Sequence, residues 1–159
     1  MDRLGNYIPP HVIKERIFVS GGAFLKVHQF GKEQPKKRMF FILNKNPKKD
    51  DRVIIVNPTT QIEKRKKYRS SEVLVEIKPD EYQPMKEDSI VDCESYNIWN
   101  KQELENKIGA GEIELLQQLP ESLLKRLRIA VSKSKTLAPV DKRLVLGEEE
   151  MLSSPNTED

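Results

Sequence analysis

The chain has 159 residues, of which 36% are hydrophobic and 33% are charged, and its formal net charge at pH 7 is +3. This length predicts one domain with a modest core, from which the two chain ends are the segments most easily left out. The single cysteine, Cys93, excludes an internal disulfide and a cysteine zinc site, and no apolar run reaches the length of a membrane span.

The N-terminus lacks the apolar segment of a secretory signal, so a cytoplasmic protein is expected. Charge is distributed unevenly along the chain. Residues 31–70 contain 13 Lys and Arg against 4 Asp and Glu, whereas residues 147–159 contain five acids and no base. This separation predicts a basic surface for a polyanion and an acidic tail in solvent. A lysine-rich loop with no binding role is the alternative, and composition alone does not decide between them.

Residues 1–20 are interpreted as an N-terminal extension with a short strand at residues 16–20. Gly21 and Gly22 indicate a turn, and the apolar alternation over residues 23–30 predicts a further strand.

Two apolar runs, residues 39–43 and 53–56, are separated by a polar turn and predict a buried antiparallel hairpin. Arg38 precedes the first run and Thr59 follows the second, so the two are expected to be neighbours at one rim of the sheet. A guanidinium and a hydroxyl beside several lysines form a reasonable phosphodiester site. Alternatively, Arg38 is a surface residue and Thr59 bonds its own backbone at a strand end.

Further strands are predicted at residues 71–78 and 88–92. Asn100, with Glu103 three residues later, has the pattern of a helix N-cap, and the glycines at 109 and 111 end that helix.

Pro120 opens another predicted helix, residues 121–134, with an apolar stripe that covers either its own core or a partner. Residues 136–159 are interpreted as a flexible acidic tail. Short strands followed by two helices predict a mostly β protein with α, built as a small, partly open β-barrel with C-terminal helices.

The sequence contains none of the common nucleotide-binding, serine hydrolase or zinc protease motifs. Its two histidines, His11 and His28, are too far apart for a short metal motif. His28 is interpreted as a structural residue, although proton transfer at the site stays open. Cys93 is interpreted as a buried small hydrophobe. The paired carboxylates all fall in predicted turns, and nothing indicates a metal site or a cofactor.

The ordered set Glu33-Gln34, Arg38 before an apolar strand, Asn44, and Thr59-Thr60-Gln61-Ile62 after a second strand resembles the MazF/PemK toxins of bacterial toxin–antitoxin systems. The likeness continues through later strands and the first helix and covers roughly residues 21–134.

The resemblance implies an SH3-like β-barrel (MazF/PemK/CcdB-like) with C-terminal helices over residues 21–135, acting as a homodimer. It implies a growth-inhibiting toxin that cleaves single-stranded RNA at short sequences without a metal or cofactor, leaving 2′,3′-cyclic phosphate and 5′-hydroxyl ends. A cognate antitoxin protein is the implied inhibitor.

By this resemblance Arg38 and Thr59 are the catalytic pair. The basic run, residues 64–67 with Arg69 after it, is expected to bind flanking phosphates together with Lys36 and Lys37. The resemblance places Glu33 and Gln34 in the loop that borders the RNA groove. The candidate RNA-binding residues are Glu33, Gln34, Lys36, Lys37, Thr60, Gln61, Lys64, Arg65, Lys66 and Lys67. Phe30 or Tyr68 is a candidate for stacking on a base, and the alternative is that either residue packs in the core.

Several features depart from the family pattern. Ala23 follows Gly22 where an acidic residue is common, and the N- and C-terminal extensions are not typical of the family. Met39 stands where a proline commonly follows the arginine, and Pro35-Lys36-Lys37 replaces a glycine-rich loop. The alternative function is therefore a non-catalytic SH3-like module that binds nucleic acid or a protein partner.

Overall fold

The computed structural model describes residues 8–28, 32 and 34–153, with side chains described as far as Gly147. The strands are β1 (Ala23–His28), β2 (Lys36–Ile42), β3 (Arg52–Val56), β4 (Pro58–Thr59), β5 (Leu74–Ile77), β6 (Ser89–Asp92), β7 (Asn97–Asn100) and β8 (Ile113–Leu115). The helices are α1 (Pro10–Ile17), α2 (Ile62–Tyr68), α3 (Lys101–Gly109), α4 (Glu121–Ser132) and α5 (Pro139–Ser153), with a short 3-10 helix, η2, at Ser71–Val73.

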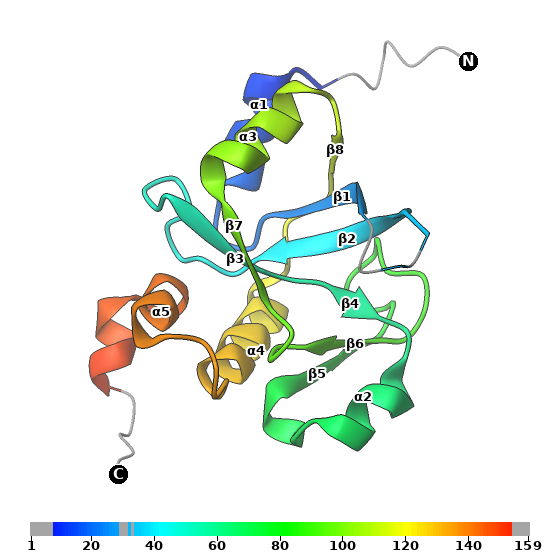
Figure 1. Ribbon diagram of the computed structural model, residues 1–159, viewed down its shortest axis with the longest axis vertical. Helices are drawn as coiled ribbons and strands as arrows, with labels where there is room; N and C mark the ends of the chain where they lie inside the picture. Colours follow the sequence, from blue (N-terminus) through cyan, green and yellow to red (C-terminus); the bar gives the residue numbers. More distant parts are fainter. Residues whose placement is uncertain (1–7, 29–31, 33, 154–159) are drawn as a thin grey trace.

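The strands form two antiparallel sheets (Figure 1). The larger has the order β7-β3-β2-β1-β8 and the smaller the order β4-β6-β5. Among the described residues no strand pairing joins the two sheets, so the strands do not form one closed barrel. The expectation of antiparallel β-structure combined with helices is confirmed.

The predicted central hairpin is confirmed as β2 and β3, in an antiparallel register that pairs Phe41 with Val56. A buried asparagine, Asn44, stabilises the return of the chain from β2 to β3. Its side-chain oxygen accepts a hydrogen bond from the Ile54 N–H at 2.7 Å, and its side-chain amide donates to the carbonyl of Arg52 at 3.0 Å. Because these bonds satisfy the buried amide, the two strands are held in register at their turn.

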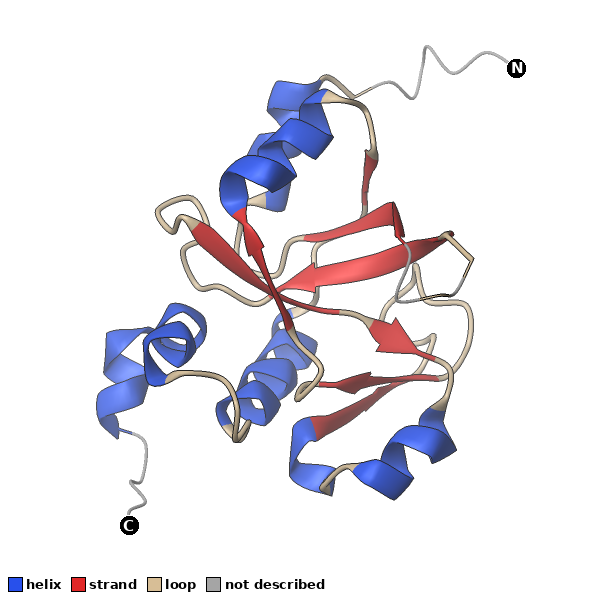
Figure 2. Ribbon diagram, in the orientation of Figure 1, coloured by secondary structure: helices blue, strands red, loops and turns tan. Residues whose placement is uncertain are grey.

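Alternation along β2 sends successive side chains into two cores on opposite faces of the larger sheet. Phe41 packs in a core with residues of β5, β6, α4 and α5, whereas Phe40 and Ile42 pack in a core with residues of α1 and α3. Figure 2 shows the helices α1 and α3 on one side of this sheet and α4 with the smaller sheet on the other. Arg38, two residues before Phe40, belongs to the α1/α3 face by the same alternation.

The two predicted helices are confirmed as α3 and α4. The Asn100 side chain accepts a hydrogen bond from the Glu103 N–H at 3.2 Å, as its cap pattern predicts. The apolar stripe of α4 is buried in the protein's own core, as its packing alternative predicts; it comprises Leu123, Leu124, Leu127, Ala130 and Val131. None of the helices in the described part of the chain is long and apolar enough to cross a membrane.

The strand expected at residues 16–20 is wrong, because that segment contains the end of helix α1. Pro10 opens α1, where its fixed φ suits the first helical turn. Ile13 and Ile17, four residues apart, are then buried on one face of the helix. Gly22 lets the next strand pass close to this helix, because a Cβ at Gly22 would lie 1.9 Å from the carbonyl oxygen of Ile17.

The tail expected from residue 136 contains helix α5. Val145 and Leu146 are buried in the core with α4, and Asp141 binds Arg52 across 2.7 Å. Gly147, at φ 81°, kinks the helix. The apolar positions of this segment are few and are followed by acids, which explains why periodicity alone did not reveal a helix.

Candidate functional site

Most of the predicted site residues line one cavity of about 600 Å³ at the rim of the larger sheet. We call it the Arg38 cavity. The predicted residues among its lining are Lys36, Lys37, Arg38, Thr59, Thr60, Gln61 and Arg65.

The strand register explains why Arg38 and Thr59 meet there. Continuing the pairing of Phe41 with Val56 along the hairpin sets Arg38 opposite Thr59. The chain leaves β3 after Val56, and Thr59 then pairs with Ile90 of the smaller sheet. Arg38 and Thr59 therefore approach the cavity from two different sheets.

The hydroxyl of Thr59 is oriented by its local turn. The Gln61 N–H donates a hydrogen bond to Thr59 Oγ1 at 3.2 Å. Because a hydroxyl has one hydrogen to donate and this contact uses only its acceptor side, Thr59 keeps its donor for a ligand. The turn alternative for Thr59 is thus confirmed, and this contact is compatible with binding.

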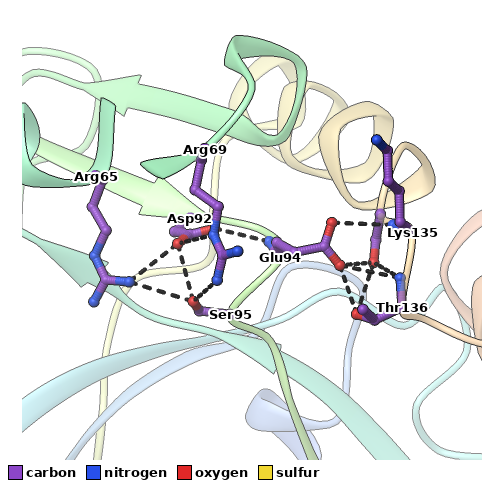
Figure 3. A network of polar contacts seen from close by, with 8 residues as sticks. Arg65, Arg69, Asp92, Glu94, Ser95, Lys135 and Thr136 are labelled. Carbon is purple, nitrogen blue, oxygen red and sulfur yellow. Dashed lines mark hydrogen bonds and ion pairs between the residues drawn. The ribbon is translucent and has the colours of Figure 1, made fainter. Parts of the chain in front are cut away.

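Arg65 reaches the cavity from α2 and is held there by a buried carboxylate (Figure 3). Arg65 Nη1 lies 3.1 Å from Asp92 Oδ2, and Arg69 Nε lies 2.9 Å from the same oxygen. The Ser95 hydroxyl also donates to Asp92, at 3.0 Å. Only 3% of the Asp92 side chain is exposed, so its charge is compensated within the protein by the two guanidinium groups.

The other residues of the basic run do not line the Arg38 cavity. Lys64, Lys66 and Lys67 are exposed on α2, and Lys66 Nζ lies 2.8 Å from Glu76. Lys66 lines a different cavity, of about 670 Å³, together with Arg126. Lys64 and Lys67 are exposed to solvent. They can therefore contact only those phosphates of a long RNA strand that lie outside the Arg38 cavity.

The loop before β2 is described only in part. Gln34 is exposed, while Glu33 and the stacking candidate Phe30 lie outside the described residues. Tyr68, the other stacking candidate, is 73% exposed on α2 and does not line the Arg38 cavity.

His28 lies apart from the Thr59 side of the site. It lines another cavity with Trp99. Burial lowers the pKa of His28, and the positive charges of Lys26, Arg38 and Lys107 lower it further.

Cys93 is fully buried, as expected, and burial raises the pKa of its thiol. In the part of the chain that the structure describes, no group of three or more His, Cys, Asp or Glu side chains is arranged to hold a metal ion.

The sequence does not predict five of the residues that line the Arg38 cavity: Asn57, Pro58, Ser95, Tyr96 and Asn97. Asn57 directly follows β3 and precedes Pro58, a position at which a polar residue ends a buried strand. The segment from Ser95 to Asn97 gives no comparable indication, because only the pairing of β7 with β3 brings it to the rim.

A sequence model of the family described as "PemK-like, MazF-like toxin of type II toxin-antitoxin system" matches residues 23–134. The fold resembles a solved structure described as "Endoribonuclease in complex with its cognate antitoxin from Mycobacterial species", which is 15% identical, with a TM-score of 0.49 over 76% of this chain and 96% of that chain. It also resembles "Mycobacterium tuberculosis toxin MazF-mt6", 15% identical, with a TM-score of 0.45 over 72% of this chain and 98% of that chain. No curated protein matches the sequence.

Proposed function

Because the chain belongs to the PemK-like, MazF-like toxins of type II toxin–antitoxin systems, we propose that it is an endoribonuclease acting on single-stranded RNA. The observation that carries this proposal is that Arg38 and Thr59, which are distant in sequence and lie in different sheets, line one cavity with several cations. The proposed reaction requires no metal and selects short sequences. Its products are a 2′,3′-cyclic phosphate and a 5′-hydroxyl.

The proposed chemistry is attack by the ribose 2′-hydroxyl oxygen on the adjacent phosphorus. The bond from phosphorus to the 5′-oxygen breaks, and the 2′-hydroxyl proton leaves to solvent while the 5′-oxygen takes one up. In such a step the protein must hold the reacting atoms in line and stabilise charge that grows on the phosphate oxygens. Arg38 supplies a permanent cation with forked donors, and Thr59 supplies the neutral donor that its Gln61 contact leaves available.

The cations around this pair would hold the flanking phosphates. Lys36, Lys37 and Arg65 line the same cavity, and such contacts position a strand without reading its bases. Lys37 also lies 3.0 Å from Glu114 between exposed side chains, a pair weak enough to exchange for a phosphate. Thr60 and Gln61 are the polar residues proposed to contact the bases nearest the cut.

The family membership also supports the remaining parts of the proposal. We propose that the chain acts as a homodimer in the cytoplasm, with its two sheets as the parts of an SH3-like barrel. A cognate antitoxin would inhibit it by covering the Arg38 cavity. Expression without that antitoxin would then stop growth.

A second candidate function is a module that binds nucleic acid or a protein without cutting. It is favoured by the ion pairs that occupy part of the basic run, Arg65 with Asp92 and Lys66 with Glu76, since these lower the charge available to a phosphate chain. Cleavage distinguishes the two candidates directly.

The test is cleavage of a long single-stranded RNA in excess EDTA by the wild type, Arg38→Ala and the control Lys125→Ala. Lys125 is an exposed residue of α4 on the opposite side of the larger sheet. We expect cuts with cyclic-phosphate ends by the wild type and the control, and a loss of about 100-fold or more in Arg38→Ala. Intact RNA that is nonetheless bound by the wild type would support the second candidate, and cuts that survive Arg38→Ala would place the site elsewhere.

A further inference from the structure

A second cavity, of about 230 Å³, lies on the same sheet face as Arg38. We call it the Trp99 cavity. It is lined by Lys26, His28, Trp99, Glu103, Leu104 and Lys107. These residues come from β1, β7 and α3, and the sequence assigns none of them a role in RNA binding.

The strand register places the Trp99 cavity beside the Arg38 cavity. Lys26 of the Trp99 cavity pairs directly with Arg38 across β1 and β2. On β7, Asn97 lines the Arg38 cavity and Trp99, two residues later, lines the Trp99 cavity. Residues two apart on a strand share a face, so both cavities open along one surface.

Two of the side chains that line the Trp99 cavity, His28 and Trp99, are aromatic and contact the ring of Phe40. The Phe40 ring lies 4.9 Å from the Trp99 ring and 5.6 Å from the His28 ring, measured between centroids, and the His28 and Trp99 rings are 5.7 Å apart. Phe40 is fully buried, while His28 and Trp99 are half-buried. Phe40 therefore supports two rings that keep part of their surface accessible.

The rim of the cavity carries charge that suits a nucleotide. Lys26 and Lys107 supply two cations, and with Arg38 they form the group whose charges act together on His28. Glu103 supplies a carboxylate that can accept hydrogen bonds from the amino group of a base. Aromatic surface beside cations is the combination that binds unpaired bases of single-stranded nucleic acid.

We propose that the Trp99 cavity is a base-binding subsite: an unpaired RNA base next to the cut phosphate stacks on Trp99, with Lys26 and Lys107 on its phosphate. This inference rests on the proposed ribonuclease function. It adds the residues of the Trp99 cavity as a set that selects the RNA substrate. The small volume and the two cations favour one nucleotide over an apolar protein surface. The test below also distinguishes the case in which a second copy of this chain covers Trp99.

The test uses the fact that Trp99 is the only tryptophan of the chain, so its emission reports on this cavity. The probe is a fluorescein-labelled single-stranded 2′-O-methyl RNA oligonucleotide, which has no free 2′-hydroxyl to attack. Binding is followed by the anisotropy of the label, and stacking by the emission of Trp99 in a parallel titration with unlabelled oligonucleotide. We expect saturable quenching of Trp99 at the concentrations that raise the anisotropy.

Variants distinguish the loss of a stacking contact from a folding defect and from a general loss of positive charge. Trp99→Ala should weaken binding about 5- to 100-fold, and Trp99→Phe, which keeps a ring, should restore most of it. Lys107 is exposed, so Lys107→Ala should fold normally; it should lower the slope of log affinity against log salt by about 0.7, and Lys125→Ala should leave it unchanged.

Three results would overturn the subsite. In the first, the anisotropy shows that the RNA binds, but the emission of Trp99 stays constant and Lys107→Ala has the same salt dependence of affinity as Lys125→Ala. The ribonuclease proposal would then stand, but this cavity would have no part in it. In the second, Trp99→Ala changes the molar mass measured by light scattering but not the RNA affinity, which assigns the cavity to contact between copies. In the third, the wild type does not bind the oligonucleotide at all, and the proposed function fails together with the subsite.

Discussion

The buried carboxylate of Asp92 holds the guanidinium of Arg65 at 3.1 Å, and Arg65 in turn lines the cavity that contains Arg38 and Thr59. Asp92 ends β6, and Arg65 lies on α2. Their contact therefore ties the helix that follows Thr59 to the smaller sheet, and it fixes one wall of the candidate site.

Replacing the carboxylate of Asp92 should lower the stability of the protein. Asp92→Asn keeps the shape of the side chain but removes the charge that compensates Arg65 and Arg69, so we expect unfolding free energy to fall by about 1–3 kcal/mol. Urea unfolding followed by circular dichroism measures the change. Asp80→Asn, at an exposed turn position, is the control and should stay within about 0.5 kcal/mol. Equal stability of the two variants would mean that the Asp92 contacts do not stabilise the fold.

Glu94 should make the stability of the protein depend on pH in the acid range. Burial alone would raise its pKa, but hydrogen bonds from the hydroxyls of Ser134 and Thr136 and from the backbone N–H groups of Lys135 and Thr136 outweigh burial and lower the pKa to about 2 (Figure 3). A carboxyl whose pKa is lowered on folding stabilises the protein above its ordinary pKa, and this contribution is lost as the pH falls.

The loss should fall between about pH 4.5 and pH 2, the interval between the ordinary pKa of Glu94 and its lowered value. The midpoint of urea unfolding should therefore decline more steeply over this interval in the wild type than in Glu94→Gln. Glu87→Gln, at an exposed turn position, should follow the wild type. Parallel curves for the wild type and Glu94→Gln would contradict the assignment.

The two lysines Lys36 and Lys66 should differ in their contribution to RNA binding. Lys36 lines the Arg38 cavity, whereas Lys66 pairs with Glu76 beside another cavity. Lys36→Ala should lower the slope of log affinity against log salt by about 0.7, the value for one phosphate contact on a single strand. Lys66→Ala should change it less. Titrations with an uncleavable oligonucleotide at several salt concentrations measure both slopes, and an equal reduction would show that the RNA also follows the Lys66 side.

Much of the hairpin could be predicted because its information is local. Residues 39–43 and 53–56 are apolar runs long enough to be buried strands, and antiparallel pairing then places Arg38 near Thr59 without further knowledge. The N-cap at Asn100 and the apolar stripe of α4 could also be predicted, because a cap and a helical period are patterns within one short segment.

The parts that could not be predicted depend on contacts between distant segments. Helix α1 is stabilised by burying Ile13 and Ile17 against residues of α3, which its own sequence does not indicate. Ser95 and Asn97 join the site only because β7 pairs with β3. The sequence predicts RNA binding along the whole basic run, whereas helix α2 directs Arg65 towards Asp92 and Lys66 towards Glu76.

Gly22 gives a test of the packing between α1 and β1. A Cβ there would lie 1.9 Å from the carbonyl oxygen of Ile17, so Gly22→Ala must move the end of α1 or the start of β1. We expect unfolding free energy to fall by about 1–3 kcal/mol or more. Gly109→Ala is the matched control, because nothing lies within 4 Å of its Cβ, and it should stabilise α3 by about 0.4–1 kcal/mol. A neutral Gly22→Ala would contradict the close approach of α1 and β1.

The central claim is that Arg38 and Thr59 act together on one phosphate, and a double-mutant cycle tests it most directly. Single-turnover cleavage of a defined single-stranded RNA in EDTA is measured for the wild type, Arg38→Ala, Thr59→Val and the double variant. If both side chains serve the same transition state, each single variant should lose about 100-fold or more, and the double variant should lose little beyond the worse single variant. Losses that multiply fully would mean that the two residues act independently, and unchanged cleavage in either single variant would contradict the site.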